Sequence, residues 1–206
     1  MTKAFYLFVT GIFWLIGCFT IVGIGPVTTA LYYSTAKSIR RDRGSPIHEF
    51  SYALKENWKK AMLAGVMVLL LGLSTYLTDY DFIVELILRG TTSSPLLLLL
   101  SVIKVFLVFG LSIYLFPILS RFQVKLPKAF LVCIGLMFRH LGLTLIMIAL
   151  QISAIFIGIT FPELCWMVPG PYMLLLSYPM EKVLRRYVSQ EETVASEYND
   201  PWYMEK

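Results

Sequence analysis

Charged residues are scarce in this sequence. Asp, Glu, Lys and Arg make up 15% of its 206 residues, whereas 57% of the residues are hydrophobic. This balance is too apolar for an ordinary soluble domain. The net charge is +5, but the basic residues cluster beside apolar runs rather than on a soluble face. We therefore expect them to contact anionic membrane lipids, and we expect no binding to nucleic acid.

Motifs for catalysis and metal binding are also missing from the sequence. Its two histidines, His48 and His140, belong to no HExxH motif or Cys–His cluster, and neither a GxSxG motif nor a phosphate-binding GK[ST] loop occurs. The three cysteines, Cys18, Cys133 and Cys165, form no CxxC pair and are odd in number, which argues against a disulfide framework. We expect buried thiols, no catalysis, no metal and no cofactor.

What the sequence does contain is a series of apolar runs. They are continuous in Leu, Ile, Val and Phe rather than alternating, which favours helices over the strands of a membrane barrel. A helix of about 20 apolar residues spans a bilayer, and its backbone groups are satisfied internally. We therefore predict an all-α membrane protein, a single membrane domain over residues 1–206. The five predicted transmembrane helices cover residues 4–24, 61–77, 95–119, 141–159 and 164–178.

Two amphipathic stretches, 46–60 and 127–140, precede the second and fourth runs. Each has a proline at its start, the position in a helix where proline is best tolerated. They predict two interfacial helices on the cytoplasmic side. A proline also lies near the inner end of each inward-running segment, at Pro26, Pro117 and Pro179, which indicates a shaped cytoplasmic rim. Residues 180–206 are predicted to be a polar tail.

The topology prediction follows from the positions of the basic residues. With the N-terminus outside and residues 25–60 forming a cytoplasmic loop, 15 of the 18 Lys and Arg lie on the inner side. Lys3 and Arg89 then lie outside, and Lys104 lies within the membrane. The opposite orientation reverses this ratio and breaks the positive-inside rule. Five spans therefore predict an outer N-terminus and a cytoplasmic C-terminus.

Lys104 is the one charged residue within the predicted spans. A cation inside a bilayer is costly and marks a functional site by default. Gln151 in the fourth run lies at a similar depth, so we predict an intramembrane polar pair of Lys104 and Gln151. The alternatives are that the Lys104 side chain reaches the outer surface or contacts a substrate or partner. The acidic segment with Asp79, Asp81 and Glu85 is expected to be a solvated outer surface.

A second candidate site is a cytoplasmic surface that would contact lipids or a protein partner. Its members are basic residues and one interfacial tryptophan near the predicted inner ends of the spans. They are Arg40, Arg41, Arg43, Lys55, Trp58, Lys59, Lys60, Arg121 and Arg139.

Four blocks of the sequence carry a family resemblance. They are residues 24–33 (IGPVTTALYY), 50–60 (FSYALKENWKK), 114–122 (YLFPILSRF) and 138–145 (FRHLGLTL). With them the chain resembles the YesL family of small bacterial integral membrane proteins, a domain of unknown function. The family's activity is undefined, so the resemblance assigns no catalytic or ligand-binding residue.

The resemblance implies a cellular location and a role in uptake. YesL-like proteins occur in gene neighbourhoods with ABC-type importers of complex carbohydrates. The resemblance therefore implies an accessory component of the bacterial plasma membrane that works in carbohydrate uptake beside importer permease or ATPase subunits. The alternative is a self-sufficient small transporter or channel that acts as a homo-oligomer.

Overall fold

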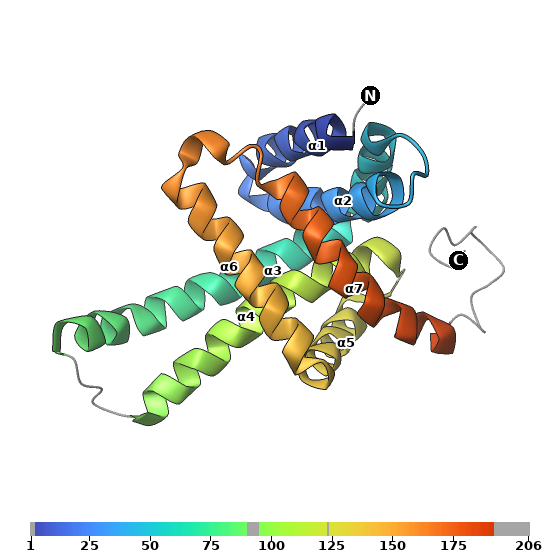
Figure 1. Cartoon of the computed structure of the whole chain (residues 1–206). Helices are drawn as coiled ribbons and strands as arrows, with labels where there is room; N and C mark the ends of the chain where they lie inside the picture. The colour runs from blue at the N-terminus through green and yellow to red at the C-terminus, as the bar shows by residue number, and fades with distance from the viewer. Residues whose placement is uncertain (1–2, 90–94, 123, 192–206) are drawn as a thin grey trace.

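The protein is all-α, as the sequence predicts. The computed structural model describes residues 3–89, 95–122 and 124–191, and Figure 1 shows how its helices are arranged. Two 3-10 turns, η1 (Ile21–Gly23) and η3 (Pro162–Leu164), and a π-helical turn, η2 (Thr35–Ile39), accompany the longer helices. Those helices are α1 (Lys3–Cys18), α2 (Ile24–Ser34), α3 (Pro46–Arg89), α4 (Pro95–Arg121), α5 (Leu126–Arg139), α6 (Leu141–Thr160) and α7 (Pro169–Glu191).

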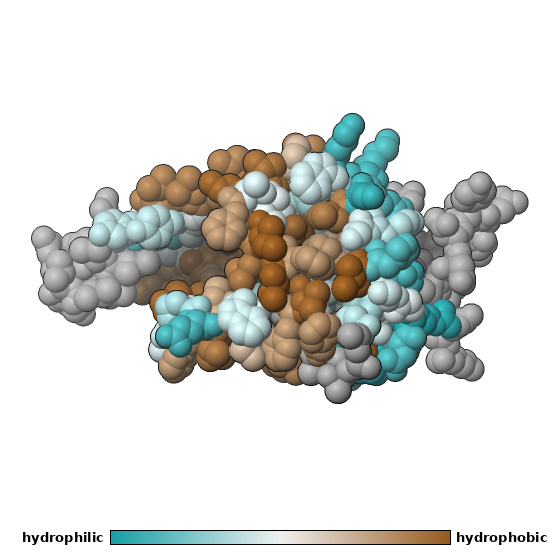
Figure 2. Space-filling view, turned by 90° about the horizontal axis from the view of Figure 1, so that it is seen from above, coloured by the Kyte–Doolittle hydropathy of each residue, from teal (hydrophilic) through white to brown (hydrophobic). Residues whose placement is uncertain are grey.

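Three of these helices contain segments long and apolar enough to cross a membrane. The segments are Pro46–Tyr80, Leu96–Arg121 and Leu141–Thr160. They include three of the five predicted spans, whereas the apolar part of α1, Phe5–Cys18, is shorter. On the face shown in Figure 2, hydrophobic side chains cover the middle of the molecule and hydrophilic side chains gather at one end. These features are those of a multi-pass membrane protein.

Helix α3 corrects the predicted boundaries around residue 60. The sequence predicts an interfacial helix at 46–60, a separate span at 61–77 and an acidic loop after it, but α3 is one helix of 44 residues. At 1.5 Å per residue it is about 66 Å long. No proline interrupts this stretch, so nothing ends the helix where the amphipathic part meets the apolar part. Helices α3 and α4 pack against each other and extend together away from the other helices (Figure 1).

The first apolar run is not one helix either. Helix α1 ends at Cys18, Thr20 is extended, and α2 begins at Ile24 and runs back along α1. Pro26 lies in the first turn of α2, where it costs no hydrogen bond, so it starts a helix rather than ending one. A side chain on Gly17 would collide with Val27, so glycine permits the close packing of the two helices.

This reversal corrects the predicted position of the N-terminus. Lys3 Nζ lies 2.7 Å from a carboxylate oxygen of Asp42, in the connection between η2 and α3. The start of α1 and this connection therefore lie at the same end of the molecule, whereas the sequence predicts them on opposite sides of the membrane. The prediction was wrong because a run long enough for one crossing forms a helix and the start of a second.

Helix α2 forms the centre of the core, although its residues were predicted to begin a cytoplasmic loop. Ten of its 11 residues are buried, and it packs against α1, α3, α4 and α7. Its hydroxyl groups bond to nearby groups: Thr29 Oγ1 donates to the Gly25 carbonyl at 2.9 Å, and Trp14 Nε1 donates to Thr28 Oγ1 at 3.0 Å. Gly25 faces Gly65 of α3 so closely that a side chain on either glycine would collide with the facing backbone.

The C-terminal half departs less from the prediction. Helix α5 occupies the range of the second amphipathic stretch, with Ala129, Cys133, Leu136 and Met137 buried, and α6 occupies the range of the fourth span. Helix α7 begins at Pro169, later than residue 164, and continues through Pro179 to Glu191. The first part of the predicted polar tail is therefore helical.

Candidate functional site

The end of η2, the end of α4 and the middle of α7 meet at a group of charged side chains. The π turn η2 continues α2, with the Arg40 N–H donating to the Thr35 carbonyl at 3.0 Å, and it places Arg40 and Arg41 at its end. Helix α4 ends at Arg121, one turn after Pro117, and Glu181 lies just after Pro179 in α7. Two of the predicted inner ends, at Pro117 and Pro179, thus meet the end of η2 at one carboxylate, whereas the third, at Pro26, begins α2 and lies at the other end of that helix.

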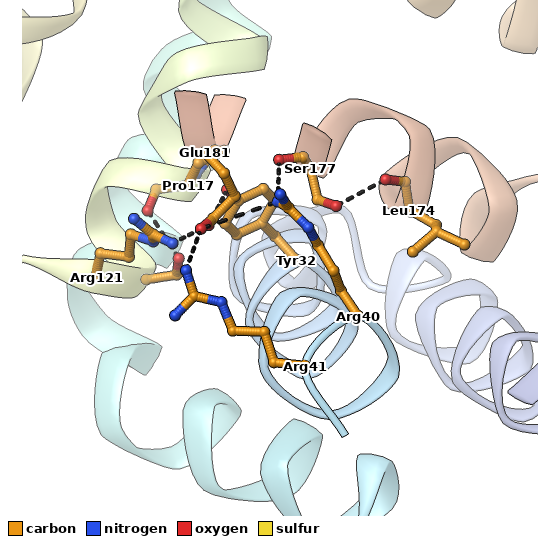
Figure 3. A network of polar contacts seen from close by, with 9 residues as sticks. Tyr32, Arg40, Arg41, Pro117, Arg121, Leu174, Ser177 and Glu181 are labelled. Atoms are coloured by element: carbon orange, nitrogen blue, oxygen red, sulfur yellow. Dashed lines mark hydrogen bonds and ion pairs between the residues drawn. The ribbon is translucent and has the colours of Figure 1, made fainter. Parts of the chain in front are cut away.

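Glu181 is the centre of this cluster. Arg121 Nη2 donates to Glu181 Oε1, to which the Tyr32 hydroxyl also donates at 3.2 Å. On the other oxygen, Oε2, Arg41 Nη2 donates at 3.0 Å, and Arg40 Nη1 lies 3.9 Å away. Figure 3 shows the three arginines reaching Glu181 from different sides. We call Tyr32, Arg40, Arg41, Arg121 and Glu181 the Glu181 cluster.

Arg40 also ties the cluster to the surface of α7. Its Nη1 donates to the Ser177 carbonyl at 2.8 Å, and its guanidinium carbon lies 4.6 Å from the centre of the Tyr178 ring. A planar guanidinium suits both contacts, since it donates in its plane and stacks on its face. Tyr178 is exposed, so this side of the cluster faces outward.

Burial differs sharply across the cluster. The side chains of Arg121 and Glu181 are 0% and 1% exposed, whereas those of Arg41 and Arg40 are 13% and 21% exposed. Burial raises the pKa of Tyr32, although the charges of Arg121, Arg40 and Arg41 act to lower it. The phenol therefore stays a neutral donor. Within the Glu181 cluster, three guanidinium groups face one carboxylate.

A one-to-one ion pair lies close by in the chain. Lys37 Nζ lies 2.8 Å from Glu49 Oε2 and 3.3 Å from the Tyr33 hydroxyl. Burial alone would lower the pKa of Lys37, but the hydrogen bonds and charges of Glu49 and Tyr33 outweigh it and raise the pKa above its ordinary value. Gly44, at φ 75°, packs on Glu49, where a side chain would collide with the carboxylate. This pair fixes η2 to α3.

The predicted cytoplasmic surface divides into two groups. Arg121 is buried, so the predicted surface position is corrected for this residue. Arg40, Arg41 and Arg43 are half-buried. Of these, Arg40 and Arg41 belong to the Glu181 cluster. The remaining predicted members are exposed: Lys55, Trp58, Lys59, Lys60 and Arg139.

Glu181, which holds the buried cluster together, is not among the residues predicted from the sequence. Glu181 was placed within the polar tail because its neighbours in the chain are basic. An isolated acid two residues after Pro179, at the same inner level as the arginines, was the available signal.

Lys104 and Gln151, which were predicted to form a pair, each bond to a different residue. Lys104 Nζ lies 2.5 Å from Asp79 Oδ1, and Gln151 Nε2 donates to Ser112 Oγ at 3.0 Å. The predicted mutual contact is therefore corrected, as is the solvated position of Asp79, which is 4% exposed. The reason is the continuous helix α3, because it brings Asp79 beside α4 at the level of Lys104 instead of ending before it.

An apolar groove of about 420 Å³ lies beside the second of these contacts. Helices α3 and α4 form most of its walls, and α6 contributes Gln151. Its polar groups are Ser112, Gln151 and the hydroxyl of Tyr76. The lining residues are Val68, Leu69, Gly72, Leu73, Tyr76, Val108, Phe109, Ser112 and Gln151.

Comparison with known proteins finds a family match for part of the chain. Residues 7–79 match the family model described as "Protein of unknown function, DUF624". This DUF624 domain includes α2 and most of α1 and α3. It therefore contains residues 24–33, the first of the four sequence blocks that carry the family resemblance. No curated protein and no solved structure gives a significant match to the chain. Within the described ranges, no group of three or more His, Cys, Asp and Glu could hold a metal ion.

Proposed function

We propose that the protein is a non-catalytic accessory component of ABC-type carbohydrate uptake in the bacterial plasma membrane. The proposal extends the DUF624 match at residues 7–79 to the YesL family, which the chain resembles also at 114–122 and 138–145. The function itself comes from the gene neighbourhoods of that family, so it is an association that needs a direct test.

The observation that favours an accessory subunit over a carrier is how the buried polar groups are used. Lys104 is paired with Asp79, Gln151 with Ser112, and the Tyr114 hydroxyl lies 2.9 Å from Thr144 Oγ1. A sugar path through one subunit needs polar groups that face water and exchange partners. Groups that already bond to one another support a structural subunit over a carrier.

The proposed contact with an importer uses the basic end of the molecule. Lys55, Trp58, Lys59 and Lys60 are exposed on α3, which is joined to the core through small residues such as Gly65. This surface suits acidic loops of a permease or ATPase subunit, with membrane lipids around it. By the positive-inside rule we assign this end to the cytoplasm, and the contact between Lys3 and Asp42 supports a cytoplasmic N-terminus.

Site-specific crosslinking in a native host tests the proposal. A photoreactive residue at Lys59 should capture a permease or ATPase subunit of a carbohydrate importer. The matched control is the same photoreactive residue at Leu145, an exposed position on α6, which should capture lipid or nothing. Failure to recover importer subunits from the Lys59 position above the control level would remove the importer from the proposal.

The groove at Ser112 and Gln151 favours one other candidate, a small transporter or channel formed by several copies of the chain. Packing of copies around this groove would put Gln151 on a shared path. Sugar flux into proteoliposomes that contain this protein alone would favour the transporter and argue against the accessory role.

A further inference from the structure

Gln151 lines the apolar groove between α3, α4 and α6, and its hydrogen bonds there are incomplete. The Ser112 hydroxyl lies 2.7 Å from the Phe109 carbonyl oxygen and 3.2 Å from Gln151 Oε1, but it has one proton to donate. The nearer carbonyl receives this proton, and Gln151 Nε2 donates to Ser112 Oγ at 3.0 Å. The Gln151 amide therefore keeps a carbonyl oxygen and an N–H that no described residue satisfies.

The depth of Gln151 decides what can complete these bonds. Gln151 lies midway along α6, and Ser112 precedes the end of α4 by about 14 Å along the helix axis. Both residues are thus close to the middle of a bilayer whose hydrocarbon core is about 30 Å thick. Lipid headgroups and bulk water do not reach this level, and acyl chains form no hydrogen bonds. The missing partner is therefore a polar group of another membrane-spanning helix.

The apolar lining of the groove suits such a helix. Leu73 and Tyr76 are exposed, and Gly72 lies beside them. A Cβ on Gly72 would meet only Val108 Cγ1, at an ordinary contact distance of 3.7 Å, so packing within one copy of the chain does not require glycine here. Small residues on a membrane helix let a neighbouring helix approach closely. Gly72 thus leaves room for a partner at the groove.

We propose that the groove is the contact surface between two copies of the chain, with Gln151 at its centre. Each copy brings a free carbonyl oxygen and a free N–H on Gln151, and a Tyr76 hydroxyl that has no hydrogen-bond partner among the described residues. A two-fold axis along the membrane normal keeps both copies at one depth, so the donors of one copy meet the acceptors of the other. A different protein would have to supply matching groups at this same depth.

The dimer goes beyond the proposed accessory role and does not rest on it. It also differs from the transporter formed by several copies, because polar groups that bond to each other across the groove leave no water-filled path for a sugar.

Energy transfer between copies tests the dimer. The full-length protein carries Lys3→Cys in a background free of other cysteines, and one half is labelled with a donor dye and the other with an acceptor dye. Both are reconstituted together in liposomes over a range of protein-to-lipid ratios. Transfer should rise to a plateau as the ratio increases, because association depends on protein concentration. Transfer no greater than random proximity produces at every ratio would overturn the proposal.

Variants with a matched control locate the contact in the same assay. Gln151→Leu should weaken the dimer about tenfold through the loss of hydrogen bonds between helices, and Gln151→Asn, which keeps the carboxamide, should weaken it less. The control is Ser153→Ala. Ser153 is exposed on the opposite face of α6, and its hydroxyl already donates to the Ala149 carbonyl at 2.8 Å. A dimer that Gln151→Leu leaves unchanged, or that both variants weaken equally, would overturn the proposal.

Crosslinking in native membranes identifies the occupant directly. A photoreactive residue at Gln151 should capture a second copy of the chain. The same photoreactive residue at Phe156, exposed on another face of α6, should capture lipid alone. Capture of a different protein at Gln151, or of lipid alone, would overturn the proposal.

Discussion

Replacing Glu181 with glutamine removes the carboxylate that Arg40, Arg41 and Arg121 share while nearly preserving the side-chain shape. Glutamine can still accept a hydrogen bond from Arg121, but its charge is zero. The three guanidinium groups then lose the carboxylate that they share, and one of them, on Arg121, is fully enclosed. Arg121 has no route to water without movement of α4 or α7.

The expected loss of stability is large. Breaking a buried ion pair by removing one partner costs about 3–5 kcal/mol, because the remaining charge stays buried. Against a total unfolding free energy of about 5–15 kcal/mol, this is about a fifth of the stability or more. For a chain of this length the corresponding fall in Tm is on the order of 10 °C.

The measurement is thermal unfolding in detergent, followed by far-UV circular dichroism, for wild type, Glu181→Gln and Asp42→Asn. Asp42 is the matched control because its pair with Lys3 is open to solvent, with side chains 69% and 59% exposed. An exposed pair contributes about 0–1 kcal/mol, so Asp42→Asn should change Tm by no more than about 4 °C. A Glu181→Gln protein that unfolds at the wild-type temperature would refute the burial argument.

Four further outcomes are expected. Thr35→Val should keep or raise Tm in the same assay, because the Thr35 hydroxyl is buried without a hydrogen-bond partner among the described residues. Lys104→Met should lower Tm by leaving the Asp79 carboxylate buried and unpaired, and adding Asp79→Asn should restore part of the loss. Burial raises the pKa of the Cys133 thiol to about 12, so maleimide at neutral pH should label Cys133 only after unfolding. A cysteine at position 3, in a protein otherwise free of cysteine, should resist an impermeant reagent applied to intact spheroplasts; labelling there would place the N-terminus outside.

The helices that could be predicted best are those that apolar composition and boundary residues define together. The predicted ranges 95–119, 127–140 and 141–159 coincide within about two residues with α4, α5 and α6. Each begins at or next to a proline or just after basic residues, and hydropathy changes sharply at those points. Sequence alone locates such a helix because its length and its limits depend on local residues.

Helix α2 could not be found in this way, because its composition is that of a loop. Thr28, Thr29, Tyr32, Tyr33 and Ser34 lower its hydropathy, yet all are buried. Threonine and serine can satisfy their hydroxyl groups on the carbonyl one turn back in the same helix, as Thr29 does with Gly25. A polar residue that bonds within its own helix can be buried at little cost, and hydropathy does not detect this.

Only the arginines of the candidate site could be predicted from the sequence, for a related reason. Arg40, Arg41 and Arg121 attract attention in the sequence because basic residues beside apolar runs have a general meaning for membrane topology. Glu181 has no such general meaning, and its role depends on which helices meet. The same holds for Asp79, whose burial follows from the length of α3 and not from its own neighbours.

The π turn at the end of α2 links the fold to the direction of the two half-buried arginines, Arg40 and Arg41. Each residue of an α-helix turns the chain by about 100°, and a π turn holds one residue more than an α turn. If the same residues 35–39 were α-helical, Arg40 and Arg41 would point about 100° away from their present direction. Glu181 would then lose these two arginines and keep its contacts with Arg121 and Tyr32. The π turn is therefore what directs Arg40 and Arg41 to Glu181, and the close packing of α2 on α1 and α3 at Gly17 and Gly25 holds that turn within reach of α7.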